Sequence, residues 1–524
     1  MKLVLIVDAR QVTRWQLAAL QRLGEIAPVL VLSCRNTRAR RSIGKHFLYY
    51  VFNRFTVRNY WSRKVAIDGS SVRVREIVDF DSDYDGSWQR LPQAVIDRIA
   101  AEQADAVLKF GMNLLRVPPA LETPILSYHH GDPDQYRGRP AGFWESFHGK
   151  TWMGQIVQII SDRLDAGAVV AYGETRIVPH SYRATIMKAY RHSPLLLRRA
   201  IENAMSGRRI PKPCTGRNYR LPGNMIVARL LLRQASAIVG RLLYGAFFEK
   251  SWTVSTAPAS AEAFARDGTF PAAAQWCHLA RSGRHIFHAD PFYIDEPAGI
   301  LVEAMNRSTG KGELVLVRGG AGEALVSDPR RHFSYPATVR ENGRTYVVPE
   351  ISHWSAPAIF ELRDGGLEEV GRIDVDESPR ITDPTFFRHE DRLYLFGNKT
   401  EEGTDALYLW SSDSLFGRFV EHPSNPILVS PSGSRMAGQI LSCGGAVYRF
   451  GQSSLKGYGN GALIFRINAL TPSAYAETCV RELRFEDVRG PHTVNWADGE
   501  VLFDWYEDRF GALAWLRRLR ARLG

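Results

Sequence analysis

The feature that most constrains this chain is a repeat in its second half. After residue 250 a short strand, a turn with glycine and an aromatic strand recur five times, beginning at Asp290, Tyr335, Asp383, Gln439 and His492. Repeats of about 45 residues that encode only strands indicate a β-propeller, because one blade cannot bury its apolar faces alone. We predict a five-bladed propeller over 250–510, with residues 252–254 supplying the strand that closes the ring. A β-sandwich is the alternative, but it does not explain the period of the repeat.

The first half of the chain instead alternates strands and helices. We predict strands at 2–7, 29–33, 106–110 and 125–128, and helices at 13–23 and 91–103. Short apolar strands separated by amphipathic helices are typical of a Rossmann-like, doubly wound α/β domain with a parallel sheet. Because ligands of such sheets bind beyond the carboxyl ends of the strands, we look for chemistry after residue 126.

These patterns divide the chain into four predicted parts. They are an α/β domain at 1–180, a helical linker at 181–249, the propeller at 250–510 and a basic C-terminal helix at 511–524. Residues 225–248 and 513–523 are amphipathic. They are expected to pack as a linker helix and a terminal helix, or to attach the protein peripherally to anionic lipid.

Composition narrows the class of protein. Five scattered cysteines without a CxxC pair favour reduced thiols, and no uncharged apolar stretch reaches the roughly 18 residues of a membrane span, so we expect a cytoplasmic protein. The net charge is +12, but basic residues mostly alternate with acids outside 35–45, 198–212 and 517–522. Without a basic motif of recognisable fold, we expect an anionic small molecule or membrane surface as partner and no nucleic acid.

One strand end carries the candidate chemistry of the first domain. It presents Ser127, His129 and His130, and the later strand at 155–160 leads to Asp165 in a turn. A carboxylate that holds an imidazole is the usual arrangement for proton transfer. Two adjacent histidines in a loop are also common as surface residues. A zinc site of His129, His130, Asp132 and Asp165 is conceivable, but its spacing matches no known pattern.

The order of motifs around this strand resembles the folate-dependent formyltransferases, which include methionyl-tRNA, glycinamide ribonucleotide and sugar N-formyltransferases. The matching elements, within roughly residues 70 to 175, are Tyr136-Arg137-Gly138, Pro140, Phe143-Trp144 and Leu164-Asp165-Ala166-Gly167. The resemblance implies that His129 is the general acid/base and that Asp165 orients it. It implies 10-formyltetrahydrofolate as co-substrate, in a pocket lined by Phe110, Gly111, Met112, Asn113 and Leu164. It also implies acceptor contacts from Tyr136, Arg137 and Trp144.

One position departs from this family. Ser127 stands where the family has an asparagine that donates a hydrogen bond to the developing oxyanion. A serine hydroxyl reaches less far, and the loss of one oxyanion donor typically costs about 10²–10³ in rate. Either Ser127, helped by His130, replaces the donor, or the domain has changed or lost its reaction.

The propeller repeats resemble arabinanase-type glycoside hydrolases and, more closely, the N-terminal domain of glucosamine inositolphosphorylceramide transferases. The closer match rests on residues 435–438, 448–452, 458–459, 470–471, 475–477 and 492–493. The resemblance places Asp290 at the position of the hydrolase base and Asp383 at that of the modulator, but Arg435 stands where the acid should be. A guanidinium does not release a proton, so we predict a glycan-binding module rather than a glycosidase. Its predicted contact residues are Asp290, Glu350, Asp383, Arg435 and His492.

Together these patterns predict transfer of a formyl group from 10-formyltetrahydrofolate to an amino sugar, on a nucleotide or a glycan, with the propeller positioning the acceptor. Two alternatives stay open. One is a glycan-binding protein whose catalytic site is altered, and the other is a glycan-active enzyme centred on the propeller. The polar propeller residues are equally consistent with a purely structural role between blades.

Overall fold

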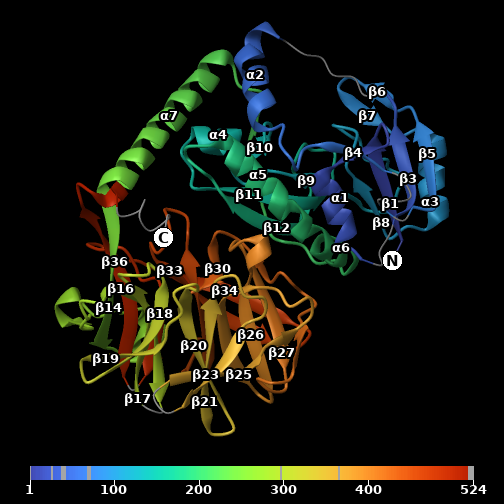
Figure 1. Cartoon of the computed structure of the whole chain (residues 1–524). Helices are drawn as coiled ribbons and strands as arrows, with labels where there is room; N and C mark the ends of the chain where they lie inside the picture. Colours follow the sequence, from blue (N-terminus) through green and yellow to red (C-terminus); the bar gives the residue numbers. More distant parts are fainter. Residues whose placement is uncertain are drawn as a thin grey trace. The chain divides into compact units, whose positions relative to one another are not determined.

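The computed structural model describes residues 2–24, 28–36, 43–67, 72, 74–295, 298–363, 366–497 and 499–516. The chain folds into two compact units, residues 1–239 and 240–524. The first is an α/β unit, and the second is built mainly of strands, with a short helix, α8 (Ala261–Asp267) (Figure 1). The predicted combination of an α/β domain with a five-bladed propeller is therefore confirmed. Residues 517–524, which include the basic end of the predicted C-terminal helix, lie outside the described residues.

The sheet of the first unit has a parallel centre and an antiparallel edge. Its parallel strands, in spatial order, are β9 (Ile125–His129), β8 (Ala106–Lys109), β1 (Leu3–Asp8), β3 (Pro28–Cys34) and β5 (Glu76–Phe80). The edge strands β11 (Trp152–Ile159) and β12 (Ala168–Arg176) run antiparallel to their neighbours. Strands β1 and β8 are apolar up to their last residues, Asp8 and Lys109, because both of their faces are buried. The sequence analysis missed β5, whose residues are mostly half-exposed and form no apolar run.

Helices cover both faces of this sheet. Val95 and Ile99 of α3 (Gln93–Glu102) pack into the core against Ile6 and Leu32. Helices α5 (Tyr182–His192) and α6 (Leu197–Met205) contact β12, and α1 (Arg14–Gln21) contacts the 3-10 helix η2 (Ser193–Leu196). Helix α5 begins where the Ser181 hydroxyl accepts the N–H of Ala184 at 3.1 Å. The other elements of the unit are β2 (Gln11–Thr13), η1 (Gly44–His46), α2 (Phe47–Thr56), β4 (Lys64–Ala66), β6 (Asp83–Asp85), β7 (Trp88–Arg90), β10 (Tyr136–Gly138), α4 (Phe143–Phe147) and β13 (Arg217–Tyr219).

Helix α7 (Asn224–Phe247) contains the boundary between the two units. Its first turns pack into the first unit through Val227 and Leu230, beside Tyr49 and Phe52 of α2. Although α7 is long, no helix among the described residues is both long and apolar enough to cross a membrane.

Five antiparallel sheets form the blades of the propeller. The first four blades are β16 (His285–Asp295), β17 (Ala298–Asn306), β18 (Gly312–Arg318) and β19 (Ala321–Val326); β20 (Phe333–Glu341), β21 (Arg344–Ile351), β22 (Ala358–Arg363) and β23 (Gly366–Arg372); β25 (Ile381–His389), β26 (Arg392–Lys399), β27 (Ala406–Ser412) and β28 (Arg418–Glu421); and β30 (Ser432–Met436), β32 (Ala446–Ser453), β33 (Ala462–Leu470) and β34 (Tyr475–Leu483). Short strands β24 (Asp374–Val375), β29 (Leu428–Val429) and β31 (Leu441–Cys443) extend two of these sheets, and β24 is the one addition that pairs in parallel, with β28.

The fifth blade joins the two ends of the propeller. It combines β35 (Val494–Ala497) and β36 (Glu500–Phe510) with β14 (Phe248–Pro258) and β15 (Cys277–His278). Strand β14 pairs with β36 along its whole length, from Phe248 opposite Phe510 to Pro258 opposite Glu500. The predicted closing strand is confirmed, and it extends well beyond residues 252–254. This pairing satisfies the backbone groups that an open ring would leave exposed at two sheet edges.

Candidate functional sites

The strand register gathers polar side chains on one face of the first unit's sheet. Ser127 and His129 are two residues apart on β9 and therefore share a face. The ladder pairs Lys109 of β8 with Ser127 on one side and with Ile6 of β1 on the other. Asp8 follows Ile6 by two residues, so it lies on the same face at the same carboxyl edge. This edge is where ligands of parallel sheets bind.

His129 is held between two acceptors in this position. Its Nδ1 lies 3.4 Å from Asp165 Oδ2, and its Nε2 lies 3.2 Å from the backbone oxygen of Tyr136. Asp165 is fixed in turn, because the N–H of Gly138 donates to its Oδ2 at 2.9 Å. Asp165 also has a φ of +48°, a strained conformation that sharp turns at functional sites often hold. The structure thus brings together the imidazole and the carboxylate expected from the sequence.

Lys109 is a member of this group that the sequence analysis missed. Burial lowers the pKa of Lys109 to about 8, against the opposing effect of Asp165 and Asp8. A lysine with such a pKa is present near neutral pH as both ammonium and amine. The sequence did contain a signal for Lys109. It is the one charged residue of the apolar strand at 106–109 and directly precedes residues 110–113, which were expected to line the folate pocket.

His130 points to the opposite face of the sheet. Its ring packs edge-on against Trp15 and Tyr190, at centroid distances of 5.4 and 5.2 Å, and its Nε2 lies 2.8 Å from Ser193 Oγ. Burial and the neighbouring imidazole lower the pKa of His130 to about 3, so this side chain is neutral. The expectation that His130 assists Ser127 is wrong, because β-strand alternation separates them. The zinc set considered from the sequence is not assembled, for the same reason.

The predicted folate-lining residues separate into two groups. The ring of Phe110 packs into the aromatic cluster of the opposite face, and Met112 is fully buried in the core. Gly111 lies so close to β1 that a Cβ there would come within 2.5 Å of the backbone of that strand. Only Asn113, which is exposed, and Leu164, which is half-buried, present side chains outward.

Tyr136, Arg137 and Trp144 shape one wall of this region. Strand β10, which contains Tyr136 and Arg137, pairs in parallel with β13. The Arg137 guanidinium and the Trp144 indole each donate to a backbone carbonyl of segment 214–220, both at 3.1 Å. The polar groups of Arg137 and Trp144 therefore hold segment 214–220 beside strand β10.

The innermost strands of the propeller carry a shared backbone distortion. Asp290, Tyr335 and Asp383 each precede a proline, and their φ values are +45°, +47° and +49°. At the same points the register of β16, β20 and β25 with their neighbours shifts. A bulge of this kind redirects a side chain away from the regular alternation. The repeat thus places one redirected polar residue in each of the first three blades.

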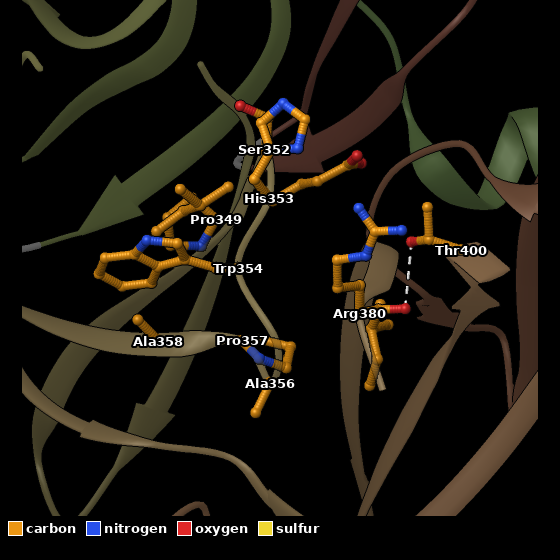
Figure 2. A pocket seen from close by; sticks show the side chains of 12 residues that line it. Pro349, Ser352, His353, Trp354, Ala356, Pro357, Ala358, Arg380 and Thr400 are labelled. Atoms are coloured by element: carbon orange, nitrogen blue, oxygen red, sulfur yellow. Dashed lines mark hydrogen bonds between the residues drawn. The ribbon is translucent and has the colours of Figure 1, made fainter. Parts of the chain in front are cut away.

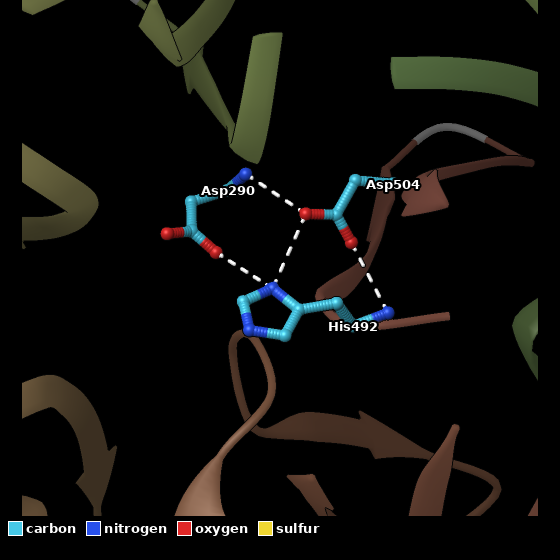
Figure 3. A group of neighbouring side chains, drawn as sticks. All are labelled: Asp290, His492 and Asp504. Carbon is cyan, nitrogen blue, oxygen red and sulfur yellow. Dashed lines mark hydrogen bonds and ion pairs between the residues drawn. The ribbon is translucent and has the colours of Figure 1, made fainter. Parts of the chain in front are cut away.

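The first and last blades are joined by a buried triad (Figure 3). His492 Nδ1 lies 3.1 Å from Asp290 Oδ1 and 3.3 Å from Asp504 Oδ2. Asp504 also accepts the backbone N–H groups of Asp290, His492 and Thr493, at 3.0, 3.1 and 2.6 Å. Although burial opposes it, Asp504 and Asp290 raise the pKa of His492 to about 10. The triad is therefore an imidazolium between two carboxylates at neutral pH.

Asp290, His492 and Asp504 are also close enough to hold a metal ion. A histidine must be deprotonated to ligate a metal, and the raised pKa of His492 opposes this. The backbone donors to Asp504 already occupy its oxygens. The arrangement fits an ion-paired triad better than a metal centre.

Half-buried Arg435 and buried Asp383 form a second charge pair in the propeller. The guanidinium binds both carboxylate oxygens, with its Nη2 at 3.0 Å from Oδ1. Gln452 donates to the same carboxylate at 3.0 Å, and Glu350 accepts the N–H of Asp383 at 3.2 Å. Burial and the charge of Asp383 raise the pKa of Glu350 to about 8. The structure thus brings Glu350, Asp383 and Arg435 together, while Asp290 and His492 form the neighbouring triad.

Polar residues also recur in the second strand of each propeller blade, a periodicity that the sequence analysis did not use. The second strand of every blade carries a polar residue at a similar place in the repeat: Glu303, Glu350, Asn398, Gln452 and Asp504. All are buried except Glu350, which is half-buried. Their recurrence at one place in each repeat was the sequence signal for Asp504 and Gln452.

Aromatic rings lie beside these charged groups. The ring of His492 is 5.1 Å from that of Trp252 and 4.6 Å from that of Tyr458. The Arg435 guanidinium lies over the Tyr458 ring at 5.0 Å. Rings beside paired charges offer both apolar and hydrogen-bonding contacts to a polar ligand.

A cavity of about 150 Å³ opens next to Glu350 (Figure 2). It is lined by the end of β21, the connection to β22 and the first residue of β22, together with Arg380, Ile381 and Thr400. The Thr400 hydroxyl donates to the backbone oxygen of Arg380 at 3.1 Å, which fixes one wall. The Trp354 ring is covered by the guanidinium of Arg331, at 4.1 Å, and by that of Arg372, at 4.6 Å.

Comparison with known proteins finds similarity to both parts of the chain. The family described as glucosamine inositolphosphorylceramide transferase 1, N-terminal, matches residues 279–499. Among solved structures, glycinamide ribonucleotide transformylase 1 from Symbiobacterium toebii is 18% identical, with 42% of this chain and 94% of that chain covered and a TM-score of 0.27. A formyltetrahydrofolate deformylase from Pseudomonas putida KT2440 is 17% identical, with 39% of this chain and 65% of that chain covered and a TM-score of 0.26. RS223-Beta-xylosidase is 9% identical, with 38% of this chain and 77% of that chain covered and a TM-score of 0.30. No curated protein matches the chain.

Proposed function

We propose that the first unit transfers a formyl group from 10-formyltetrahydrofolate to the amino group of a sugar. The propeller then binds or positions the glycan or nucleotide sugar that carries this amine. The observation that carries the proposal is the pair of buried His129 and half-buried Asp165 at the carboxyl edge of the sheet. An imidazole held by a carboxylate at such an edge can move a proton during attack by an amine.

The residues present fit the chemistry of formyl transfer. When bound, the folate supplies an activated formyl group on nitrogen. With the Nδ1 proton of His129 directed to Asp165, Nε2 takes the proton that the attacking amine loses as its bond to the formyl carbon forms. The same imidazole returns that proton to the leaving nitrogen as the old carbon–nitrogen bond breaks. Asp165 keeps the ring oriented and stabilises its protonated form, so every proton is accounted for within this pair.

Lys109 explains how the reaction proceeds without the family's asparagine. Its neighbour across the ladder is Ser127, so the ammonium and the hydroxyl occupy the same face. A cation in a buried site stabilises a developing oxyanion more strongly than a neutral donor does. We infer that Lys109 and Ser127 together donate to the formyl oxygen.

The test is a formyl-transfer assay with nucleotide-linked amino sugars as acceptors. His129→Asn should reduce kcat by about 10³ or more, and Lys109→Met by about 10²–10³, the range for loss of an oxyanion donor. Adding Ser127→Asn to Lys109→Met should restore part of the loss. Lys456→Met, on an exposed position of the propeller, is the matched control. Absence of transfer, together with no calorimetric binding of 5-formyltetrahydrofolate at millimolar concentration, would overturn the proposal.

A second candidate is a glycan-active enzyme centred on the propeller. The observation in its favour is the raised pKa of Glu350, which keeps a carboxyl protonated near neutral pH beside Asp383. Arg435 opposes it, because the guanidinium occupies both oxygens of Asp383. Release of reducing sugar from oligosaccharides that is abolished by Glu350→Gln would favour this candidate. Saturable glycan binding without cleavage would favour the positioning role.

A further inference from the structure

Two segments of the first half of the chain are basic and contain no acidic residue. Residues 26–67 hold nine lysines and arginines, and residues 203–248 hold eight, without a single aspartate or glutamate in either. In a chain with 55 acidic residues, such stretches are unusual. They point to a surface whose partner is anionic.

The fold brings these two segments together. The side chain of Asn224, at the start of α7, accepts the N–H of Leu48 and donates to the backbone oxygen of Gly44, both at 3.0 Å. His46 Nδ1 lies 2.9 Å from the backbone oxygen of Pro222. Helix α2 and the first turns of α7 also share one apolar cluster (Figure 1). The two helices therefore form one continuous surface, here named the α2–α7 surface (residues 43–60 and 224–239).

This surface exposes large apolar side chains. On α2, Phe47, Val51 and Phe55 are spaced by four residues along one face and are 54%, 41% and 69% exposed. On α7, Met225 and Leu232 are 67% and 71% exposed. Val239, which is 55% exposed, follows Leu232 by seven residues and continues the same stripe. This stripe lies away from the core face of α7 formed by Val227 and Leu230, because positions seven apart on a helix lie on one side and neither buried residue falls in that series.

Basic side chains lie among these apolar ones. They are Lys45, Arg54, Arg58, Arg229 and Arg233. None takes part in the ion pairs recorded within the described part of the chain. The Arg233 guanidinium instead donates to the backbone oxygen of Phe147 and lies over its ring. Cations and exposed apolar groups thus alternate on one surface without acids between them.

We propose that the α2–α7 surface binds an anionic lipid membrane. Aromatic and aliphatic side chains enter the boundary between headgroups and acyl chains, while arginines and lysines contact phosphate and carboxylate groups. A second copy of the chain is a poorer occupant, since apposing two such surfaces would place like charges together. This inference goes beyond formyl transfer and does not depend on it.

The test is cosedimentation of the full chain with phosphatidylcholine vesicles that do or do not contain about one third phosphatidylserine. We expect binding to the anionic vesicles that weakens with salt, and little binding to pure phosphatidylcholine. Arg54→Gln with Arg229→Gln should weaken the anionic binding about tenfold or more. Phe55→Ser with Leu232→Ser should weaken it as well, and both pairs are on exposed positions whose change leaves the core intact.

The matched control is Arg330→Gln, an exposed arginine of the propeller, which should bind vesicles as the unchanged protein does. Light scattering after size exclusion tests the second-copy alternative. A dimer that both variant pairs dissociate would overturn the proposal. No anionic binding, equal binding to both vesicle types, or loss of binding in the control would overturn it too.

Discussion

Asp504 connects the last blade of the propeller to the first, and its replacement offers a sharp test of the buried triad. Asp504→Asn keeps the size of the side chain but removes its charge. His492 then faces only Asp290, and an amide group replaces an oxygen that accepts backbone N–H groups. Because breaking a buried charge pair is strongly destabilising, the propeller should lose stability without losing its fold.

The pKa of His492 sets the size of this effect. Its rise to about 10, from an ordinary value near 6.5, corresponds to about 5 kcal/mol at 1.36 kcal/mol per pH unit. This stability is fully present below the unfolded-state pKa and is lost as the pH rises toward 10. Asp504 acts on His492 together with Asp290, so its removal should cost on the order of 3 kcal/mol. For a unit of this size that corresponds to a fall in Tm of roughly 6–12 °C.

Differential scanning calorimetry at pH 7 and pH 10 measures this change. Hydrogen exchange of β14 amides assigns the propeller transition, since β14 pairs with the strand that carries Asp504. The unchanged protein should lose propeller stability between the two pH values, and Asp504→Asn should lose less. Asp487→Asn, on an exposed position, is the isosteric control. The reasoning fails if Asp504→Asn melts within 2 °C of the unchanged protein at pH 7, or keeps the same pH dependence.

Three further outcomes are expected. The first unit should gain stability from pH 7 to pH 10, opposite to the propeller. Burial lowers the pKa of Lys109 to about 8, so deprotonation over this range removes a buried charge. In chemical denaturation at the two pH values, Lys109→Met should reduce this gain in the free energy of unfolding. Arg449→Met leaves the carboxylate of Glu477 without its cation and should destabilise the propeller by about 3–5 kcal/mol, measured in guanidinium chloride. Gly131→Ala would place a Cβ 2.7 Å from His129 Nε2 and should lower the kcat of formyl transfer about tenfold while circular dichroism stays unchanged.

The lysine at the sheet edge changes how the first site is understood. Compared only with the asparagine of the formyltransferases at this position, Ser127 indicates the loss of a hydrogen-bond donor to the oxyanion. The ladder between β8 and β9 places Lys109 beside Ser127, so the serine that stands in place of asparagine has a cation next to it on the same face. The formyl transfer proposed above therefore depends on the pair rather than on either residue.

The sequence by itself determined the two kinds of fold and their order. Period-two strands in five repeats can bury their faces only by stacking around a ring, and alternating apolar strands and helices lead to a layered sheet. The order of Ser127, His129 and Asp165 along the chain also predicted the candidate site of the first unit, and the structure brings His129 and Asp165 together. These features are local, so they can be recognised without knowing any long-range contact.

Only the tertiary structure decided which side chains meet. Strand alternation separates His130 from His129, and register across two ladders brings in Lys109. Ring closure makes Asp504 a neighbour of Asp290, although 214 positions separate them. Such contacts depend on pairing between segments far apart in the chain, and a shift of one residue in that pairing would turn every side chain to the other face.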